Sequence, residues 1–252
     1  VVVDATFATP SLCRPFEHGA DIIVHSITKW MGGHGVAIGG VIVDGGAFDW
    51  GKYGKHPTLT EPYEPFHGIS FWEEYGPSAL VMRIRSESMR DLGPSMSPHT
   101  AFLLLQGIET LSLRMQQHVE NAKQLTRWLL EQGLVTWVNH PDLPDNPTHR
   151  VAERLFPKGA GSILCFGVKG GRDGGGAFMD ALVLSSNLAN VGDSRTLVLH
   201  PASTTHSRLS DEEMKATGTS PDLIRVSVGI ENIADIIKDF KGGLKAVERL
   251  LK

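Results

Sequence analysis

Two short apolar runs, each followed by polar or charged side chains, constrain the fold of this chain most strongly. Residues 1–5 read Val-Val-Val-Asp-Ala, and residues 21–27 read Asp-Ile-Ile-Val-His-Ser-Ile. Continuous apolarity of this length is typical of strands that are buried on both faces of a parallel sheet. Only a short helix-like link, from Pro10 to His18 and closed by Gly19, separates the two runs. Strand, short crossover and strand in this order predict an α/β fold.

The rest of the chain continues as alternating strands and helices. Residues 46–78 are the exception, because they are rich in glycine, proline and aromatic residues and show no clean period. A long irregular segment of this kind is more often functional than idle. Ser97-Pro98 is a helix start, with a capping serine and a proline at the first helical position. The other predicted elements are strands at 38–43, 162–168, 196–200 and 223–229, and helices at 110–132 and from 232 onward.

The change of pattern near residue 110 predicts two domains. Residues 1–109 form part of a large α/β domain, and residues 110–252 form a smaller α+β domain. The helix at 110–132 is expected to bury Met115, Val119, Ala122, Leu125 and Leu129. The last helix is expected to bury one face that contains Ile233, Ile236, Ile237, Phe240, Leu244 and Val247.

Charge and cysteine usage exclude several classes of protein. The net charge is −4, from 24 basic and 28 acidic residues, and no basic stripe is present, so nucleic acid and anionic membranes are not expected partners. Cys13 and Cys165 are far apart, which argues against a disulfide framework or a structural zinc site and fits a reducing cytoplasm. No apolar run approaches the roughly 20 residues that a membrane-spanning helix needs.

The chain opens inside a strand, without an initiator methionine, a signal peptide or a cap. We therefore expect it to be the C-terminal part of a longer protein.

A lysine at the mouth of the second strand indicates chemistry. The run Ser26-Ile27-Thr28-Lys29 is followed by three glycines within six residues. Asp4 ends the neighbouring strand, and ligands of open α/β sheets bind at this edge. A desolvated lysine can form a Schiff base, and a carboxylate suits the pyridinium nitrogen of pyridoxal phosphate (PLP). From spacing alone, Lys29 is equally compatible with a solvated loop lysine, and Asp4 with a strand-end residue.

Longer blocks of sequence resemble one family of enzymes. The run VVVDATFATPSLCRPFEHGADIIVHSITKWMGGHGVAIGGVIVD looks very like the PLP-lysine region of the cysteine/methionine metabolism enzymes. The resemblance continues through SPHTAFLLLQGIETLSLRMQQHVENA, SNLANVGDSRTLVLHPASTTH and PDLIRVSVGIEN, and so covers nearly the whole chain. It implies a PLP-dependent transferase fold of type I, similar to the aspartate aminotransferases, with residues 1–109 in the PLP-binding large domain and 110–252 in the small domain.

The resemblance also implies roles for individual residues. Lys29 would carry the cofactor and Asp4 would pair with its pyridine nitrogen. Ser26 and Thr28 would help to hold the phosphate, and Thr6 would lie in the same cofactor site. One departure is Ala5, because an asparagine usually follows that aspartate in the family.

Two residues of the C-terminal half would contact substrate. Arg225 matches the family's arginine for the substrate α-carboxylate, where a bidentate pair gives orientation as well as energy. Its alternative is a strand-edge arginine that pairs with Asp222 or Glu231. Asn190 would approach the same carboxylate, or would only form the turn before Gly192.

Two other motifs are interpreted as structural. His200 and His206 have a spacing that fits no metal site, so we expect a structural loop near the active site and no metal. The glycine-rich run 170–176 lacks GxGxxG spacing and a following acidic residue, which argues against a dinucleotide loop and favours a flexible surface connection.

The aromatic insert within residues 48–93 favours one branch of the family. With Tyr75-Gly76-Pro77 and Arg90-Asp91-Leu92-Gly93, it resembles the O-acetylhomoserine sulfhydrylases. This implies γ-replacement in methionine biosynthesis: O-acetyl-L-homoserine and sulfide would give L-homocysteine and acetate. The resemblance further implies a homotetramer in the cytoplasm. The alternatives are γ-elimination, O-succinylhomoserine as the donor for cystathionine or homocysteine synthesis, and a catalytically inert fragment.

Overall fold

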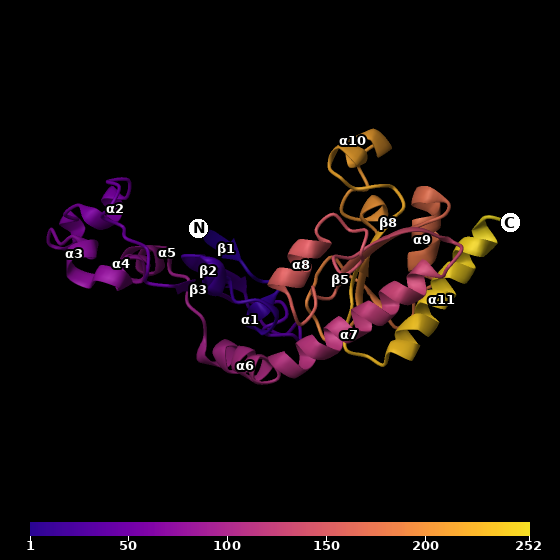
Figure 1. Ribbon diagram of the computed structural model, residues 1–252, viewed down its shortest axis with the longest axis horizontal. Helices are drawn as coiled ribbons and strands as arrows, with labels where there is room; N and C mark the ends of the chain where they lie inside the picture. The colour runs from indigo at the N-terminus through magenta and orange to yellow at the C-terminus, as the bar shows by residue number, and fades with distance from the viewer.

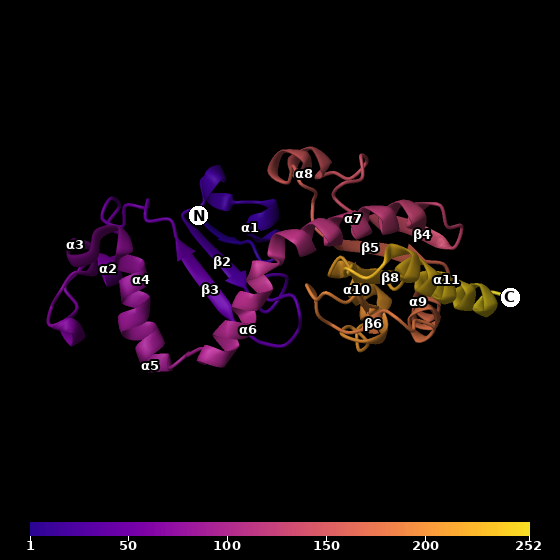
Figure 2. The ribbon, with the colours of Figure 1, turned by 90° about the horizontal axis from the view of Figure 1, so that it is seen from below.

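Two separate sheets, joined by one long helix, form the framework of the protein (Figure 1). The computed structural model describes all of residues 1–252. The three-stranded sheet has the order β1-β2-β3, and the five-stranded sheet has the order β4-β5-β8-β7-β6. Helix α7 (Leu111–Leu130) lies beside the first sheet at its start and beside the second sheet at its end (Figures 1 and 2).

The first sheet contains the strands that were predicted from residues 1–43. Its elements are β1 (Val2–Asp4), α1 (Thr9–Leu12), the 3-10 helix η1 (Pro15–His18), β2 (Ile22–Ser26) and β3 (Gly40–Asp44). β1 and β2 pair in parallel, with Val3 opposite Ile23, as the sequence predicts. β3 runs antiparallel to β2. Gly19 ends the link between β1 and β2 with a φ of 88°, a value that glycine adopts without strain.

The expected burial of these strands on both faces is wrong for this chain. Val1 and Val2 are 73% and 63% exposed, and Val41, Ile42 and Val43 of β3 are exposed as well. The reason is that β1 and β3 are the two edges of a narrow sheet, so that only β2 has a strand on either side. β2 alone shows the alternation of buried and half-buried residues that a covered strand gives.

The aromatic segment forms a small lobe that extends away from the first sheet (Figure 1). Its elements are α2 (Pro57–Thr60), the 3-10 helix η2 (Glu64–Phe66), α3 (Phe71–Tyr75), the 3-10 helix η3 (Gly76–Ser78), α4 (Ala79–Arg83), the π-helix η4 (Ile84–Met89) and α5 (Arg90–Leu92). Trp50, Leu59, Phe71 and Ala79 are its buried core. The Arg83 guanidinium lies 3.7 Å from the centre of the Tyr63 ring, a cation–π contact that stabilises the lobe from one side.

Helix α6 (Pro98–Glu109) begins where the sequence predicts, and α7 ends at Leu130, two residues before the predicted end at 132. The Ser97 hydroxyl accepts a hydrogen bond from the Thr100 amide at 3.0 Å and caps α6. Thr110 separates the two helices. The predicted inner face of α7 is confirmed, because Met115, Val119, Ala122, Leu125 and Leu129 are all buried. The apolar spacing of α6 is only partly matched by burial, since Leu104 is buried but Leu105 is 58% exposed.

The second sheet and three helices enclose the main core. The elements that follow α7 are β4 (Val135–Asn139), α8 (His149–Leu155), β5 (Ile163–Val168), α9 (Gly171–Asp180), β6 (Ser186–Asn187), β7 (Leu197–Leu199), the 3-10 helix η5 (Pro201–Ser203), α10 (Asp211–Ala216), β8 (Leu223–Ser227) and α11 (Ile233–Leu250). Phe166, Phe178 and Phe240 come from β5, α9 and α11 and pack with ring centroids 5.4 to 6.0 Å apart. α7, α9 and α11 supply the helical side of this core.

The interpretation of residues 170–176 as a flexible connection is wrong. Most of this run lies in helix α9, which begins at Gly171 and packs against α11 and β5. Its glycines permit close packing: a Cβ added at Gly174 would lie 2.0 Å from the Lys169 carbonyl oxygen, and one at Gly175 would lie 2.3 Å from the His200 ring. Low helix propensity is therefore overridden by packing. His200 is buried between Pro221 O and Ser203 Oγ, at 2.9 Å from each.

None of the helices combines the length and the hydropathy that a membrane-spanning segment requires.

Burial of His118 on α7 predicts loss of stability in acid. The Val228 carbonyl accepts a hydrogen bond from Nδ1 at 2.7 Å, so the neutral ring has no proton on Nε2, which has no partner. Burial lowers the pKa of His118 from 6.5 to about 4, so the unfolded chain takes up the proton first. The stabilisation is fully present above pH 6.5 and is lost as the pH falls toward 4.

We expect urea unfolding at pH 7.0 and pH 4.5 to show this loss. The contribution of His118 to the fall in the free energy of unfolding is roughly 2 to 3 kcal/mol. His118→Gln keeps a donor for Val228 and should reduce the fall by that amount, whereas His18→Gln, at an exposed imidazole, should leave it unchanged. An equal fall in the wild type and in His118→Gln would contradict the assignment.

Candidate active site

The polar residues predicted from the sequence gather at one edge of the first sheet. β1 ends at Asp4 and β2 ends at Ser26, and the two strands are parallel neighbours. Their carboxyl ends therefore lie at the same edge, where ligands bind in α/β sheets. Thr28 and Lys29 follow β2 directly in a tight turn.

Asp4 carries a fixed negative charge at this edge. The Thr6 amide donates a hydrogen bond to Asp4 Oδ1 at 2.9 Å. The Thr6 hydroxyl, then the Thr6 amide, and more weakly the positive charge of nearby His25, hold the pKa of the Asp4 carboxyl below its usual 3.8. Asp4 is consequently an ionised acceptor at neutral pH, and its side chain is exposed to an incoming group.

Thr6 and Thr28 both use their hydroxyl groups inside the fold. Thr6 Oγ1 accepts a hydrogen bond from the Ser26 amide at 2.8 Å and so links the ends of the two strands. The Thr28 hydroxyl donates to the Gly39 carbonyl at 3.2 Å and accepts from the Gly39 amide at 3.0 Å. Both residues thus fix the edge on which Asp4, Ser26 and Lys29 are displayed.

The glycines after Lys29 allow the turn to close tightly. The Gly32 amide donates to the Ile27 carbonyl at 2.8 Å, and the Gly33 amide donates to the Lys29 carbonyl at 2.7 Å. A Cβ at Gly32 would lie 2.7 Å from the Ile27 carbonyl oxygen, and Gly33 has a φ of 72°. A larger residue at either position would push the Lys29 backbone out of place.

Asn190 joins the lysine turn to the second sheet. Lys29 Nζ donates a hydrogen bond to Asn190 Oδ1. Arg225, on β8, directs Nη2 toward the carbonyl oxygen of Asn190 at 3.5 Å. The structure therefore brings together Lys29, Asn190 and Arg225, which are far apart in the sequence.

The alternative ion pairs of Arg225 are not formed. Asp222 instead accepts hydrogen bonds from Thr136 Oγ1 and Trp137 Nε1, both at 3.0 Å. Glu231 accepts from the amide and hydroxyl of Thr196, at 2.6 and 2.8 Å. The Arg225 guanidinium thus has no carboxylate partner within the chain. Its N–H donors are available to an anionic ligand.

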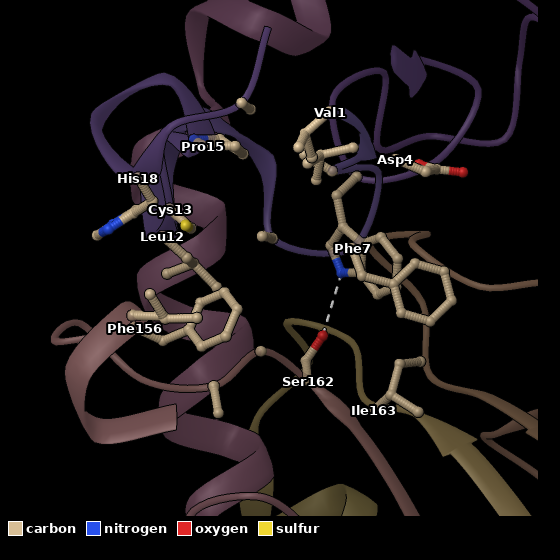
Figure 3. A pocket seen from close by; sticks show the side chains of 18 residues that line it. Val1, Asp4, Phe7, Leu12, Cys13, Pro15, His18, Phe156, Ser162 and Ile163 are labelled. Carbon is tan, nitrogen blue, oxygen red and sulfur yellow. Dashed lines mark hydrogen bonds between the residues drawn. The ribbon is translucent and has the colours of Figure 1, made fainter. Parts of the chain in front are cut away.

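An apolar cavity of about 360 Å³ lies behind the first sheet, between α1 and α8 (Figure 3). Phe7, Leu12 and Phe156 line it, and the dashed line marks the 3.1 Å hydrogen bond from Trp30 Nε1 to Ser162 Oγ. Neither Lys29 nor Arg225 belongs to its wall, and the Asp4 carboxylate points away from it. We therefore place the candidate active site on the polar side of the sheet.

Sequence reasoning missed two residues of the site's surroundings. His25 is buried on β2 and acts on the charge of Asp4, and alternation along β2 was the signal for its burial. Arg114 on α7 donates to the carbonyls of Trp30 and Met31, directly after Lys29. No local signal identifies Arg114, because these two carbonyls lie 84 and 83 residues earlier in the chain.

Comparison with known proteins places these residues in context. Residues 1–245 match the family described as Cys/Met metabolism PLP-dependent enzyme. Homocysteine synthase of Schizosaccharomyces pombe is 49% identical over 97% of this chain, and O-acetyl-L-homoserine sulfhydrylase 1 of Thermus thermophilus is 47% identical over 97%. The chain spans 58% of the length of each of these relatives.

A solved structure confirms the predicted fold class. The crystal structure of a putative O-acetylhomoserine (thiol)-lyase from Campylobacter jejuni superposes with a TM-score of 0.87 at 36% identity. The match covers 98% of this chain and 58% of that protein, which contains N′-pyridoxyl-lysine-5′-monophosphate. The mixed sheets and helices described above are thus those of a PLP-dependent transferase fold of type I.

Proposed function

This chain belongs to the Cys/Met metabolism PLP-dependent enzyme family, and on that premise we propose that it supplies the core of an O-acetylhomoserine sulfhydrylase active site. The reaction is γ-replacement: acetate leaves Cγ of O-acetyl-L-homoserine and sulfide bonds to the same carbon, which gives L-homocysteine. The observation that carries the proposal is the contact of both Lys29 and Arg225 with Asn190. The Lys29 amine and the Arg225 guanidinium, which can bind a carboxylate, thus both contact Asn190.

The chemistry of the side chains at the sheet edge fits PLP. The aldehyde of this cofactor requires an amine, its ring nitrogen requires a carboxylate, and its phosphate requires hydrogen-bond donors. Lys29, Asp4 and the hydroxyl of Ser26 meet these three needs, with Thr6 joining Asp4 to Ser26. The Thr28 hydroxyl already donates its proton to the Gly39 carbonyl, so Thr28 supports the phosphate site by fixing the turn and not as a donor. When bound, the cofactor serves as an electron sink for the substrate α-carbon.

The residues of the chain then have separate tasks. Asp4 holds the proton on the ring nitrogen through its negative charge. Arg225 binds the substrate α-carboxylate, and Asn190 positions both that carboxylate and Lys29. The Lys29 amine takes the proton from substrate Cα and helps to remove one from Cβ, so that acetate can leave Cγ. One amine can act as the base in the first proton transfer and, once protonated, as the acid in the next.

We further propose that residues 1–109 belong to the PLP-binding large domain and residues 110–252 to the small domain, in a cytoplasmic homotetramer. Support for association comes from the apolar side chains of Phe102, Leu105 and Leu113, which are 57%, 58% and 70% exposed on α6 and α7. The free thiols of Cys13 and Cys165 support a reducing compartment.

Product analysis tests the proposed reaction. The complete protein that carries this chain is incubated with O-acetyl-L-homoserine, with and without sulfide. We expect equal amounts of homocysteine and acetate, and only when sulfide is present. Release of 2-oxobutyrate without sulfide would indicate γ-elimination, and turnover of O-succinylhomoserine alone would indicate the other donor. Absence of every product, with bound cofactor, would mean that the chain is inert.

Arg225→Lys should weaken substrate binding without releasing the cofactor. Lysine keeps the positive charge but loses the planar fork that pairs with a carboxylate. The KM for O-acetylhomoserine should rise by about 10-fold or more, as expected for one lost charge-assisted hydrogen bond. Steady-state kinetics and the absorbance of bound PLP measure the two effects. Arg249→Lys, at an exposed arginine of α11, is the matched control. Loss of PLP absorbance in Arg225→Lys would instead assign Arg225 to the cofactor.

A further inference from the structure

One face of α7 carries a row of buried polar side chains that belongs to neither the apolar core nor the proposed active site. Arg114, His118 and Asn121 are separated by four and three residues, so they lie along one side of the helix. Arg114 is 5% exposed, and the other two are fully buried. All three donate hydrogen bonds to backbone carbonyls of distant segments.

Arg114 holds the turn that carries Lys29 through hydrogen bonds to its backbone. Its Nη1 donates to the Trp30 carbonyl at 2.7 Å, and its Nη2 donates to the Met31 carbonyl at 3.2 Å. Nη2 also donates to the Gly107 carbonyl at 2.6 Å, and Nε to the Thr110 hydroxyl at 3.2 Å. A buried guanidinium without a carboxylate partner is costly, and burial lowers the pKa of Arg114. The carbonyl contacts offset that cost.

The other two residues of the row hold the chain just after β8. Asn121 Nδ2 donates to the carbonyls of Gly229 and Glu231, at 3.0 and 2.8 Å. His118 donates to the Val228 carbonyl at 2.7 Å. β8 is the strand that carries Arg225. Arg114 and Asn121 are seven residues apart on α7, which corresponds to a rise of about 10.5 Å along the helix axis. The helix therefore acts as a rigid spacer between the lysine turn and the segment after β8.

We propose that Arg114 is a positioning residue for Lys29, and that the row Arg114, His118 and Asn121 sets the distance between the lysine turn and the strand of Arg225. The inference rests on the proposed function of Lys29 and Arg225. Arg114 acts through backbone: it fixes the carbonyls of Trp30 and Met31, and with them the direction in which Lys29 leaves the turn. Removal of Arg114 should therefore impair the chemical step more than the binding of substrate.

Arg114→Met tests this division in the complete protein. We expect kcat to fall by about 100-fold, as for a reacting group that is misplaced by about 1 Å. KM for O-acetylhomoserine should change by no more than about threefold, because Arg225 remains in place. Arg114→Lys restores a charged donor, so it should recover part of kcat.

Arg127→Met is the matched control, because Arg127 is exposed on the same helix. Amide hydrogen exchange gives a readout that requires no cofactor: residues 30–33 should exchange faster in Arg114→Met than in Arg127→Met. If the wild type shows no PLP absorbance, the proposed function fails. The exchange rates still test whether Arg114 holds the backbone of the lysine turn. Wild-type exchange rates in Arg114→Met would overturn the positioning role, as would an unchanged kcat in a protein that binds PLP. Where Arg114→Met does not fold, Arg114→Lys is measured instead: we expect a kcat below that of the wild type and faster exchange of residues 30–33, and wild-type values of both would overturn the positioning role.

Discussion

Lys29→Ala should abolish turnover while the fold persists. In the proposed reaction Lys29 attaches the cofactor and moves the substrate protons, and loss of a proton-transferring group alone costs up to about 10⁴-fold in rate. The fold should remain because the side chain is half-buried and its hydrogen bond goes to Asn190 alone. Homocysteine formation measures the first effect, and circular dichroism with thermal unfolding measures the second.

Lys55→Ala, at an exposed lysine of the aromatic lobe, is the control and should retain full activity. Addition of a small primary amine to Lys29→Ala should recover a fraction of the rate, because the amine can enter the space that the side chain leaves. Turnover in Lys29→Ala within 10-fold of wild type would contradict the role of Lys29.

Asp4→Asn should lower kcat by about 100-fold or more, the size of effect seen when one preorganised electrostatic partner is removed from an active site. Asparagine has nearly the same shape, so the change removes charge and leaves packing intact. Without the carboxylate the ring nitrogen loses its proton, and the cofactor withdraws electrons less strongly. Because the pKa of Asp4 lies below 3.8, the wild-type residue stays ionised through the neutral range, and its titration should not limit activity above pH 5.

The comparison variant is Asp145→Asn, at an exposed carboxylate. Both variants should bind PLP, and only Asp4→Asn should lose turnover at saturating substrate. Near-normal kcat in Asp4→Asn would show that Asp4 is only a strand-end residue.

Local signals in the sequence predict much of the fold because their physics is local. The Ser97 cap fixes the start of α6 through a hydrogen bond to Thr100, and Asn232 caps α11 through the Ala234 amide. The apolar period of α7 identifies its buried face correctly. The ends of β1 and β2 likewise predict that Asp4 and Lys29 lie at the same edge of the sheet, because parallel neighbours share one edge.

Other features depend on partners that are remote in sequence. Helix α9 has four glycines among its ten residues, and it forms because small residues allow it to approach Lys169 and His200. The direction of β3 depends on the path of the loop that precedes it. The pairing of Arg225 was open to Asp222 or Glu231 until Thr136, Trp137 and Thr196 were seen to occupy those carboxylates. The burial of Arg114 depends on remote partners for the same reason, since two of its acceptors, the carbonyls of Trp30 and Met31, lie 84 and 83 residues earlier.

The proposed function depends above all on covalent attachment of PLP to Lys29, which borohydride reduction can detect. The complete protein is reduced in the presence of PLP, digested and analysed by mass spectrometry. We expect loss of the visible absorbance band and a pyridoxyl group on the peptide that contains Lys29, and on no other peptide. A pyridoxyl group on a different lysine, or on none, would contradict it.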